Sequence, residues 1–139
     1  MPKVFAFRDP LGPGRWWQRT LVKDRLQLTS DQIEKINTIW TSYRKKIIDI
    51  DSLIKKGILD LENLLTQSEI GRQEAYKIAD NIGRLHARHR TEQIKMAIDI
   101  RQELSQEQFQ MLEEIKMELI QKIRKKSIIE HKRQEKLED

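Results

Sequence analysis

The chain has 139 residues, the size of one ordinary domain, and carries a formal net charge of +5 at pH 7. Charged residues make up 35% and hydrophobic residues 37% of it, so it is too polar for a thick globule and too rich in Ile and Leu for a disordered chain. The complete lack of cysteine excludes disulfides, thiolate metal sites and cysteine nucleophiles, and no apolar run approaches the roughly 18 residues of a membrane span.

The beginning of the chain differs in composition from the rest. All three prolines precede Arg15, so residues 1–14 are predicted to form an irregular arm. The first ten residues, MPKVFAFRDP, lack the continuous apolar run of a secretion signal. We expect either a cytoplasmic protein or a secreted one whose signal lies outside this sequence, and the sequence leaves both open.

Two segments, LTSDQI at 28–33 and LSQEQF at 104–109, share the pattern of a helix start. In each, a hydroxyl residue can accept a hydrogen bond from a backbone N–H of the first turn, and a glutamine three residues later can reach back to the N–H of the capping residue. The flanking apolar residues have the spacing of a hydrophobic staple. The capping residues are Leu28, Thr29, Gln32 and Ile33 in the first segment, and Leu104, Ser105, Gln108 and Phe109 in the second.

Apolar residues recur in steps of three and four along the chain, as in packed helices. They predict a helix over 30–65, roughly 54 Å long, a second over about 70–103 after a polar break, a third from Ser105, and a short helix before them at 16–26. Gly57 falls on the apolar stripe, where it allows close helix approach or a bend. The stripes are Ile33, Ile36, Trp40, Tyr43, Ile47, Ile50, Ile54, Gly57, Leu61 and Leu64; Ala75, Ile78, Ile82, Leu85, His89, Met96 and Ile100; and Phe109, Leu112, Leu119 and Ile123.

Long helices joined by short breaks must run antiparallel. The predicted fold class is therefore all-α: an elongated antiparallel hairpin of about four helices in a single domain at 15–125, followed by a charged, frayed helical tail at 126–139. A thin hairpin leaves stripe residues such as Trp40 and Ile47 partly wet in a monomer. We therefore expect a homodimer.

Paired Leu-Thr-x-x-Gln motifs that open two helices are characteristic of the Spy/CpxP superfamily of periplasmic stress proteins, which this chain resembles. LTSDQ at 28–32 matches the motif in full, and LSQEQ at 104–108 departs only by a serine that keeps the capping hydroxyl. The segment from Trp16-Trp17 to Leu28 also resembles the lead-in of the branch labelled heavy-metal sensor or zinc-resistance-associated. The resemblance covers about 15–125. It implies a curved, cradle-shaped helical dimer in the bacterial periplasm without enzymatic activity.

Histidines are the candidate metal ligands of this cysteine-free chain. His86 and His89 lie three residues apart on a predicted helix, so both can reach one ion, and Glu92 can add a carboxylate. The metal-sensor branch of the resembled family implies zinc, nickel or cobalt, but its histidines lie in the long N-terminal helix, and 33–64 here contains none. His89 also lies on the apolar stripe, where a hydrogen-bonded structural histidine is the ordinary case. Apart from such an ion, we expect no cofactor.

Clusters of basic residues are the second candidate functional feature. They can attract acidic partners, although a solvated helix face is the simpler interpretation. On the functional interpretation, scattered apolar side chains among the cations would hold partly unfolded polypeptides weakly and reversibly, because about 100 Å² of apolar burial yields only roughly 2–3 kcal/mol. The candidate client-binding residues are Arg44, Lys45, Lys46, Lys55, Lys56, Arg84 and Arg88.

Two classes of function have little to support them in the sequence. Basic residues alternate with acids and aromatic residues are few, which argues against nucleic acid as a partner. No phosphate-binding loop or catalytic triad pattern is present, so we expect no enzymatic activity. The leading hypothesis is a non-enzymatic, ATP-independent chaperone-like protein that binds unfolded polypeptides. The alternative is a periplasmic heavy-metal sensor or resistance protein that acts on a regulatory partner, such as a membrane-bound one.

Overall fold

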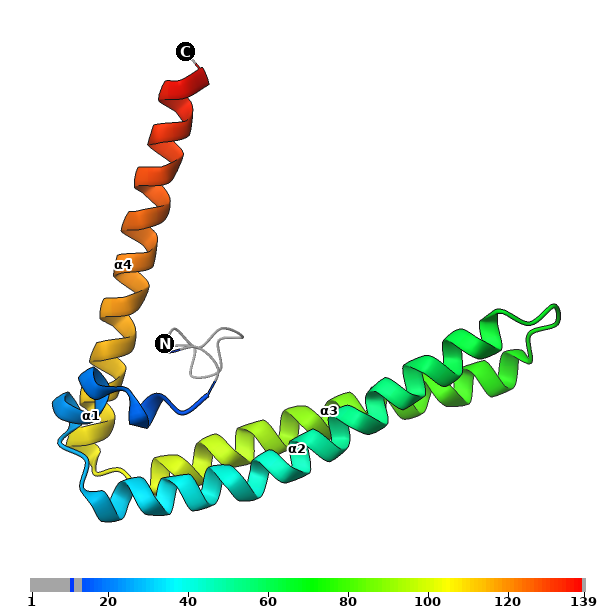
Figure 1. Ribbon diagram of the computed structural model, residues 1–139, viewed down its shortest axis with the longest axis horizontal. Helices are drawn as coiled ribbons and strands as arrows, with labels where there is room; N and C mark the ends of the chain where they lie inside the picture. The colour runs from blue at the N-terminus through cyan, green and yellow to red at the C-terminus, as the bar shows by residue number, and fades with distance from the viewer. Residues whose placement is uncertain (1–10, 12–13, 139) are drawn as a thin grey trace. The chain divides into compact units, whose positions relative to one another are not determined.

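The computed structural model describes residue 11 and residues 14–138, and every regular element in that part of the chain is a helix. The elements are a 3₁₀ turn, η1 (Trp16–Gln18), and four α-helices: α1 (Thr20–Leu26), α2 (Ser30–Leu65), α3 (Arg72–Gln102) and α4 (Gln106–Glu138) (Figure 1). The all-α class is therefore confirmed. Most of the arm predicted at 1–14 lies outside the described residues.

The chain divides into two compact units. One, the motif unit, comprises Met1–Ile33 and Leu104–Asp139 and contains both capping segments. The other, the hairpin unit, comprises Glu34–Glu103 and contains most of α2 and all of α3.

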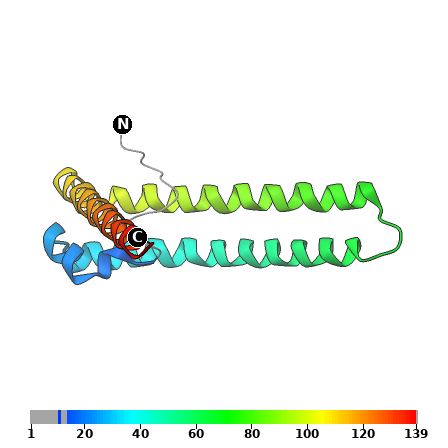
Figure 2. The same cartoon turned by 90° about the horizontal axis from the view of Figure 1, so that it is seen from above.

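In the hairpin unit, α2 and α3 run antiparallel and side by side, as Figures 1 and 2 both show. Ile50 and Ile54 of α2 form a buried cluster with Leu85 of α3. A methyl group added at Gly57 would lie only 3.0 Å from Cγ1 of Ile82, so the missing side chain does permit close helix approach. The predicted antiparallel hairpin is confirmed.

The apolar stripes predicted for this hairpin are its packed faces. Each predicted stripe residue of α2 and α3 is either buried or half-buried. Ile47, which was expected to stay partly exposed in a monomer, is only 4% exposed in the single chain, so that expectation is wrong for Ile47, whereas Trp40 is half-buried. Steps of three and four residues keep these side chains on one side of a helix with 3.6 residues per turn. The spacing of the apolar residues in the sequence therefore identified the faces of α2 and α3 that pack against each other.

The motif unit has its own core, in which α1 packs against α4. The helix predicted at 16–26 is divided, because Arg19 adopts an extended conformation between η1 and α1. Trp17 and Val22 are almost fully buried, as are Leu112 and Ile115 of α4. This core aligns α1 with the first turns of α4.

The end of α1 turns the chain directly into the start of α2. Gln27 adopts a left-handed conformation with φ 52°, and the N–H of Leu28 donates to the carbonyl of Lys23 at 3.2 Å. This bond closes the last turn as in a Schellman motif. Thr29 then follows at once as the cap of α2.

The predicted stripe of α4 needs one correction. Ile115 is buried although it was not predicted, whereas Ile123, which was, is 58% exposed. The reason is the length of α1, whose seven residues span only about 10 Å, so it covers only the beginning of α4. The segment 126–139, predicted as a charged helical tail, belongs to α4 as far as Glu138, and all described residues from 121 onward are exposed.

Candidate functional site: the paired capping motifs

Both predicted capping boxes are present in the motif unit. At the start of α2, the N–H of Gln32 donates to Thr29 Oγ1 at 3.1 Å, and the N–H of Thr29 donates to Gln32 Oε1 at 3.0 Å. At the start of α4, Ser105 and Gln108 form the same two bonds, at 2.9 and 3.1 Å. Serine therefore caps as threonine does, and the prediction is confirmed at both helix starts.

The two glutamines also bond to each other, 76 residues apart in the sequence. Gln32 Nε2 donates to Gln108 Oε1 at 2.8 Å, and Gln108 Nε2 donates to Gln32 Oε1 at 3.0 Å. Gln108 Nε2 donates in addition to the carbonyl of Leu26 at 3.2 Å. The last residue of α1 and the starts of α2 and α4 are thus held by one polar network.

The orientation of both carboxamides follows from their partners. A backbone N–H can only donate, so the atom of Gln32 that faces Thr29 must be its oxygen, and the same holds for Gln108 beside Ser105. Each amide nitrogen is then turned toward the other glutamine. A residue that could only accept could still bond to the cap and to the other glutamine, but it could not donate the second bond of the reciprocal pair.

A second polar contact joins α1 to α4. Arg25 forms a bidentate pair with Glu118, Nη1 to Oε2 at 2.5 Å and Nη2 to Oε1 at 2.9 Å, and Nη2 also contacts Met111 Sδ at 3.5 Å. The hydrogen bond from Arg25 lowers the pKa of the Glu118 carboxyl, against a smaller opposing effect of desolvation. The same bond raises the pKa of Arg25. No sequence pattern indicated this pair, because its members are 93 residues apart.

Polar contacts also cross between α2 and α3 in the hairpin unit. The Tyr43 hydroxyl donates to Asp99 Oδ2 at 2.5 Å. This bond, together with desolvation and the charges of Asp99 and Glu92, raises the pKa of Tyr43 to about 12. Oε2 of Glu92 is buried with no hydrogen-bond partner in the part of the chain that the structure describes. These groups interrupt the apolar face of the hairpin near its open end.

The structure does not bring the predicted metal ligands into one site. His86 is exposed, whereas His89 is half-buried and its Nε2 lies 3.1 Å from Asp51 Oδ1 on α2. His131, on α4, lies 3.3 Å from Glu135. Among residue 11 and residues 14–138, no group of three or more His, Asp or Glu side chains is placed to hold an ion.

All seven predicted client-binding cations are exposed, but they do not form a single patch. Arg44 and Lys55, eleven residues apart, lie on one face of α2, whereas Lys46 lies over the Tyr43 ring at 5.1 Å. Arg84 and Arg88 are on α3. The sequence did not indicate that exposed isoleucine and leucine side chains accompany the α2 pair: Ile48 and Leu59 fall on the same face and are 47% and 55% exposed.

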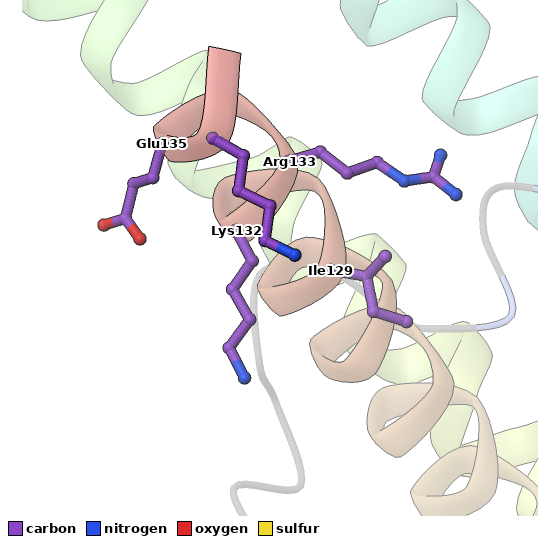
Figure 3. Close-up of a pocket in the computed structure, with 5 residues that line it drawn as sticks. Ile129, Lys132, Arg133 and Glu135 are labelled. Carbon is purple, nitrogen blue, oxygen red and sulfur yellow. The ribbon is translucent and has the colours of Figure 1, made fainter. Parts of the chain in front are cut away.

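A pocket lies near the end of α4, where Ile129, Lys132, Arg133, Glu135 and Lys136 line an open hollow. Figure 3 shows these side chains projecting from a single helix. A hollow on one helix cannot enclose a small molecule as an enzyme pocket does.

Comparison with protein-family models, with curated proteins and with solved structures finds no match to this chain. Within the described residues, no helix combines the length and apolarity that crossing a bilayer requires.

Proposed function

We propose that this protein is a non-enzymatic stress protein that binds unfolded polypeptides without ATP. The observation that carries the proposal is the exposed face of α2 on which Arg44, Ile48, Lys55 and Leu59 alternate. These four residues, called here the α2 client face, fall within about 60° of one another at 100° per residue. They span about 22 Å along the helix.

The chemistry of the α2 client face suits weak, unselective binding. Unfolded polypeptides expose apolar side chains, which Ile48 and Leu59 can cover, and Arg44 and Lys55 can attract acidic residues beside them. Covering about 100 Å² of apolar surface yields only roughly 2–3 kcal/mol. Contacts of that size form and break readily, so release needs no nucleotide hydrolysis.

The paired capping motifs support membership of the Spy/CpxP superfamily as part of the same proposal. LTSDQ and LSQEQ are not merely two capped helix starts, because Gln32 and Gln108 bond to each other. A structural role of this kind gives a physical reason for both motifs to occur in one chain. From that resemblance we further propose a periplasmic location and a homodimer, with a particle mass of about twice the 16.7 kDa of the chain in light scattering.

The proposal is tested by suppression of client aggregation. The full chain, at less than one equivalent and without ATP, is added to a chemically denatured, aggregating enzyme at low salt, and turbidity is followed. We expect suppression that weakens with added salt. It should also weaken in the double variants Ile48→Ser/Leu59→Ser and Arg44→Gln/Lys55→Gln.

The matched control is Leu21→Ser/Ile98→Ser. These residues are 59% and 48% exposed and lie outside the α2 client face, so the double variant loses similar apolar surface and should retain suppression. The proposal is wrong if the wild-type chain leaves turbidity unchanged. The α2 client face is the wrong surface if both pairs of variants behave as the control does.

The metal-sensor alternative is separated by a second measurement. Zn²⁺, Ni²⁺ or Co²⁺ added to the purified protein should leave its melting temperature unchanged if it acts only as a chaperone. A rise in melting temperature that disappears in His86→Ala/His89→Ala would favour the sensor alternative.

A further inference from the structure

The last part of α4, residues 121–138, is rich in positive charge and is separate from the α2 client face. It contains seven Lys and Arg residues and three Glu residues, and every side chain in it is exposed. Unlike the first turns of α4, it has no helix packed against it in the described part of its unit. Within its own unit, this segment therefore presents an exposed surface that a partner can reach.

The cations of this segment are gathered on one side of the helix. At 100° per residue, six of the seven fall within about 120° of one another and span about 21 Å along the axis. Ile129, which is 54% exposed, lies at the centre of this arc, and Glu130, Glu135 and Glu138 all lie outside it. This set, called here the α4 basic face, consists of Lys122, Lys125, Lys126, Lys132, Arg133 and Lys136.

Almost none of this charge is neutralised within the described chain. Lys122 lies close enough to Glu118 to help lower the pKa of that carboxyl, and the other five cations form no ion pair or hydrogen bond with a described residue. Lys122 with Lys126, and Lys132 with Lys136, are like charges four residues apart, which destabilises a helix. A surface of opposite charge would relieve that repulsion.

We propose that the α4 basic face binds the surface of a lipid bilayer that contains anionic phospholipids. A flat surface can meet a 120° arc of a straight helix along its whole length, because lysine side chains reach sideways to it. Five of the six cations are lysines, which act as point charges and do not require the fixed bidentate geometry that arginine prefers. Lipid headgroups in a fluid bilayer can rearrange around a point charge, so their binding requires positive charge and no fixed geometry.

Two other anionic partners fit this surface less well. A helix in a DNA groove meets phosphates on both flanks, whereas here the glutamates occupy the remaining side of the helix. An acidic partner helix would need an apolar seam to pack against, and Ile129 is the one apolar residue in the arc that the α4 basic face spans. The inference does not rest on the proposed chaperone function.

The test is co-sedimentation of the full chain with vesicles. Vesicles of 70% phosphatidylcholine and 30% phosphatidylglycerol are compared with pure phosphatidylcholine at low and high salt. We expect binding to the anionic vesicles alone, lost at high salt. Each cation near an anionic surface changes the partition coefficient about fivefold, so Lys125→Gln/Lys132→Gln/Lys136→Gln should weaken binding roughly a hundredfold.

Two further variants make the result specific. Lys77→Gln/Lys95→Gln/Arg124→Gln removes the same charge from exposed positions outside the α4 basic face and should change binding by less than about fivefold. Lys125→Arg/Lys132→Arg/Lys136→Arg keeps the charge and should bind as the wild type does. Circular dichroism of each variant confirms that the helices have formed.

Several outcomes would overturn the proposal. These are absence of binding to anionic vesicles, equal binding to both kinds of vesicle, and equal losses in the α4 and control glutamine variants. Duplex DNA and polyglutamate are tested as soluble competitors. If either binds through the α4 basic face while the anionic vesicles do not, the partner is a nucleic acid or an acidic polypeptide and the lipid assignment is wrong.

Discussion

Replacement of Gln108 by alanine removes four hydrogen bonds at once. The side chain accepts from the N–H of Ser105 and from the Gln32 amide, and it donates to Gln32 Oε1 and to the carbonyl of Leu26. We expect the free energy of unfolding of the motif unit to fall by about 2–3.5 kcal/mol. The mutation leaves the apolar core of the unit unchanged.

The magnitude follows from the surroundings of each bond. The bond from the Ser105 N–H is exposed, so water can replace Gln108 there at a cost of about 0.5 kcal/mol. The three bonds to Gln32 and Leu26 are partly buried. Groups left there without a partner are less easily hydrated, and each contributes about 0.5–1 kcal/mol.

The assay is urea unfolding followed by tryptophan fluorescence in a Trp40→Phe background. The remaining indoles, Trp16 and Trp17, both belong to the motif unit, and Trp17 is almost fully buried, so the signal reports on that unit. Gln121→Ala is the matched control, because Gln121 is exposed on the same helix. Its effect should stay within about 0.5 kcal/mol.

A double-mutant cycle separates the contact between the glutamines from the two caps. Gln32→Ala and Gln108→Ala should show a coupling energy of at least about 1 kcal/mol, since each removes the same reciprocal pair. Additive effects would mean that the two glutamines act as independent helix caps. A loss in Gln108→Ala no larger than in the Gln121→Ala control would refute the reasoning altogether.

Three further predictions concern pH and backbone. The pKa of Tyr43 is raised to about 12 from 10, so the contribution of Tyr43 to stability is complete below pH 10 and is lost as the pH rises toward 12. With the other tyrosine changed to phenylalanine, tyrosinate absorbance should appear near pH 12. In Asp99→Asn it should appear at lower pH. Gly83→Ala should raise the free energy of unfolding, measured in urea, by about 0.5–1 kcal/mol, because a methyl group there meets nothing within 4 Å. Gly57→Ala should raise it by less, because the added methyl would lie 3.0 Å from Cγ1 of Ile82. The pKa of Glu118 lies below its ordinary 4.5, so the stability that Glu118 contributes is present above pH 4.5 and is lost as the pH falls through the lowered pKa. The urea midpoint of the wild type should therefore fall from neutral to acid pH more than that of Glu118→Gln.

The hairpin shows how far sequence reasoning extends. The bounds of α2 were predicted, because they depend on residues near one another in the chain. At Gly57 the sequence left a close helix approach and a bend both open, and only the packing against Ile82 shows the close approach. Ile123 was predicted in the α4 stripe by the same period, but it is 58% exposed. Periodicity finds the apolar side of a helix and cannot find where the covering helix ends.

The features of the candidate sites were likewise predictable from the sequence only where they are local. The capping roles of Thr29 and Ser105 were predictable, since a hydroxyl and a glutamine three residues apart suffice for a capping box. The bond between Gln32 and Gln108 was not, because the sequence holds no measure of the distance between residues 76 positions apart. The pairing of His89 with Asp51 likewise depends on the register of two helices.

The sequence by itself determined that this protein is helical, where α2 and α4 begin, and which sides of α2 and α3 are apolar. These properties come from hydrogen bonds and periodicities that act over three or four residues. Only the tertiary structure decided that the two capping glutamines bond to each other and that Arg25 bonds to Glu118. It also left one end of α4 uncovered, because α1 is too short to reach it. Such contacts depend on how folded elements are placed together, which no local pattern of residues records.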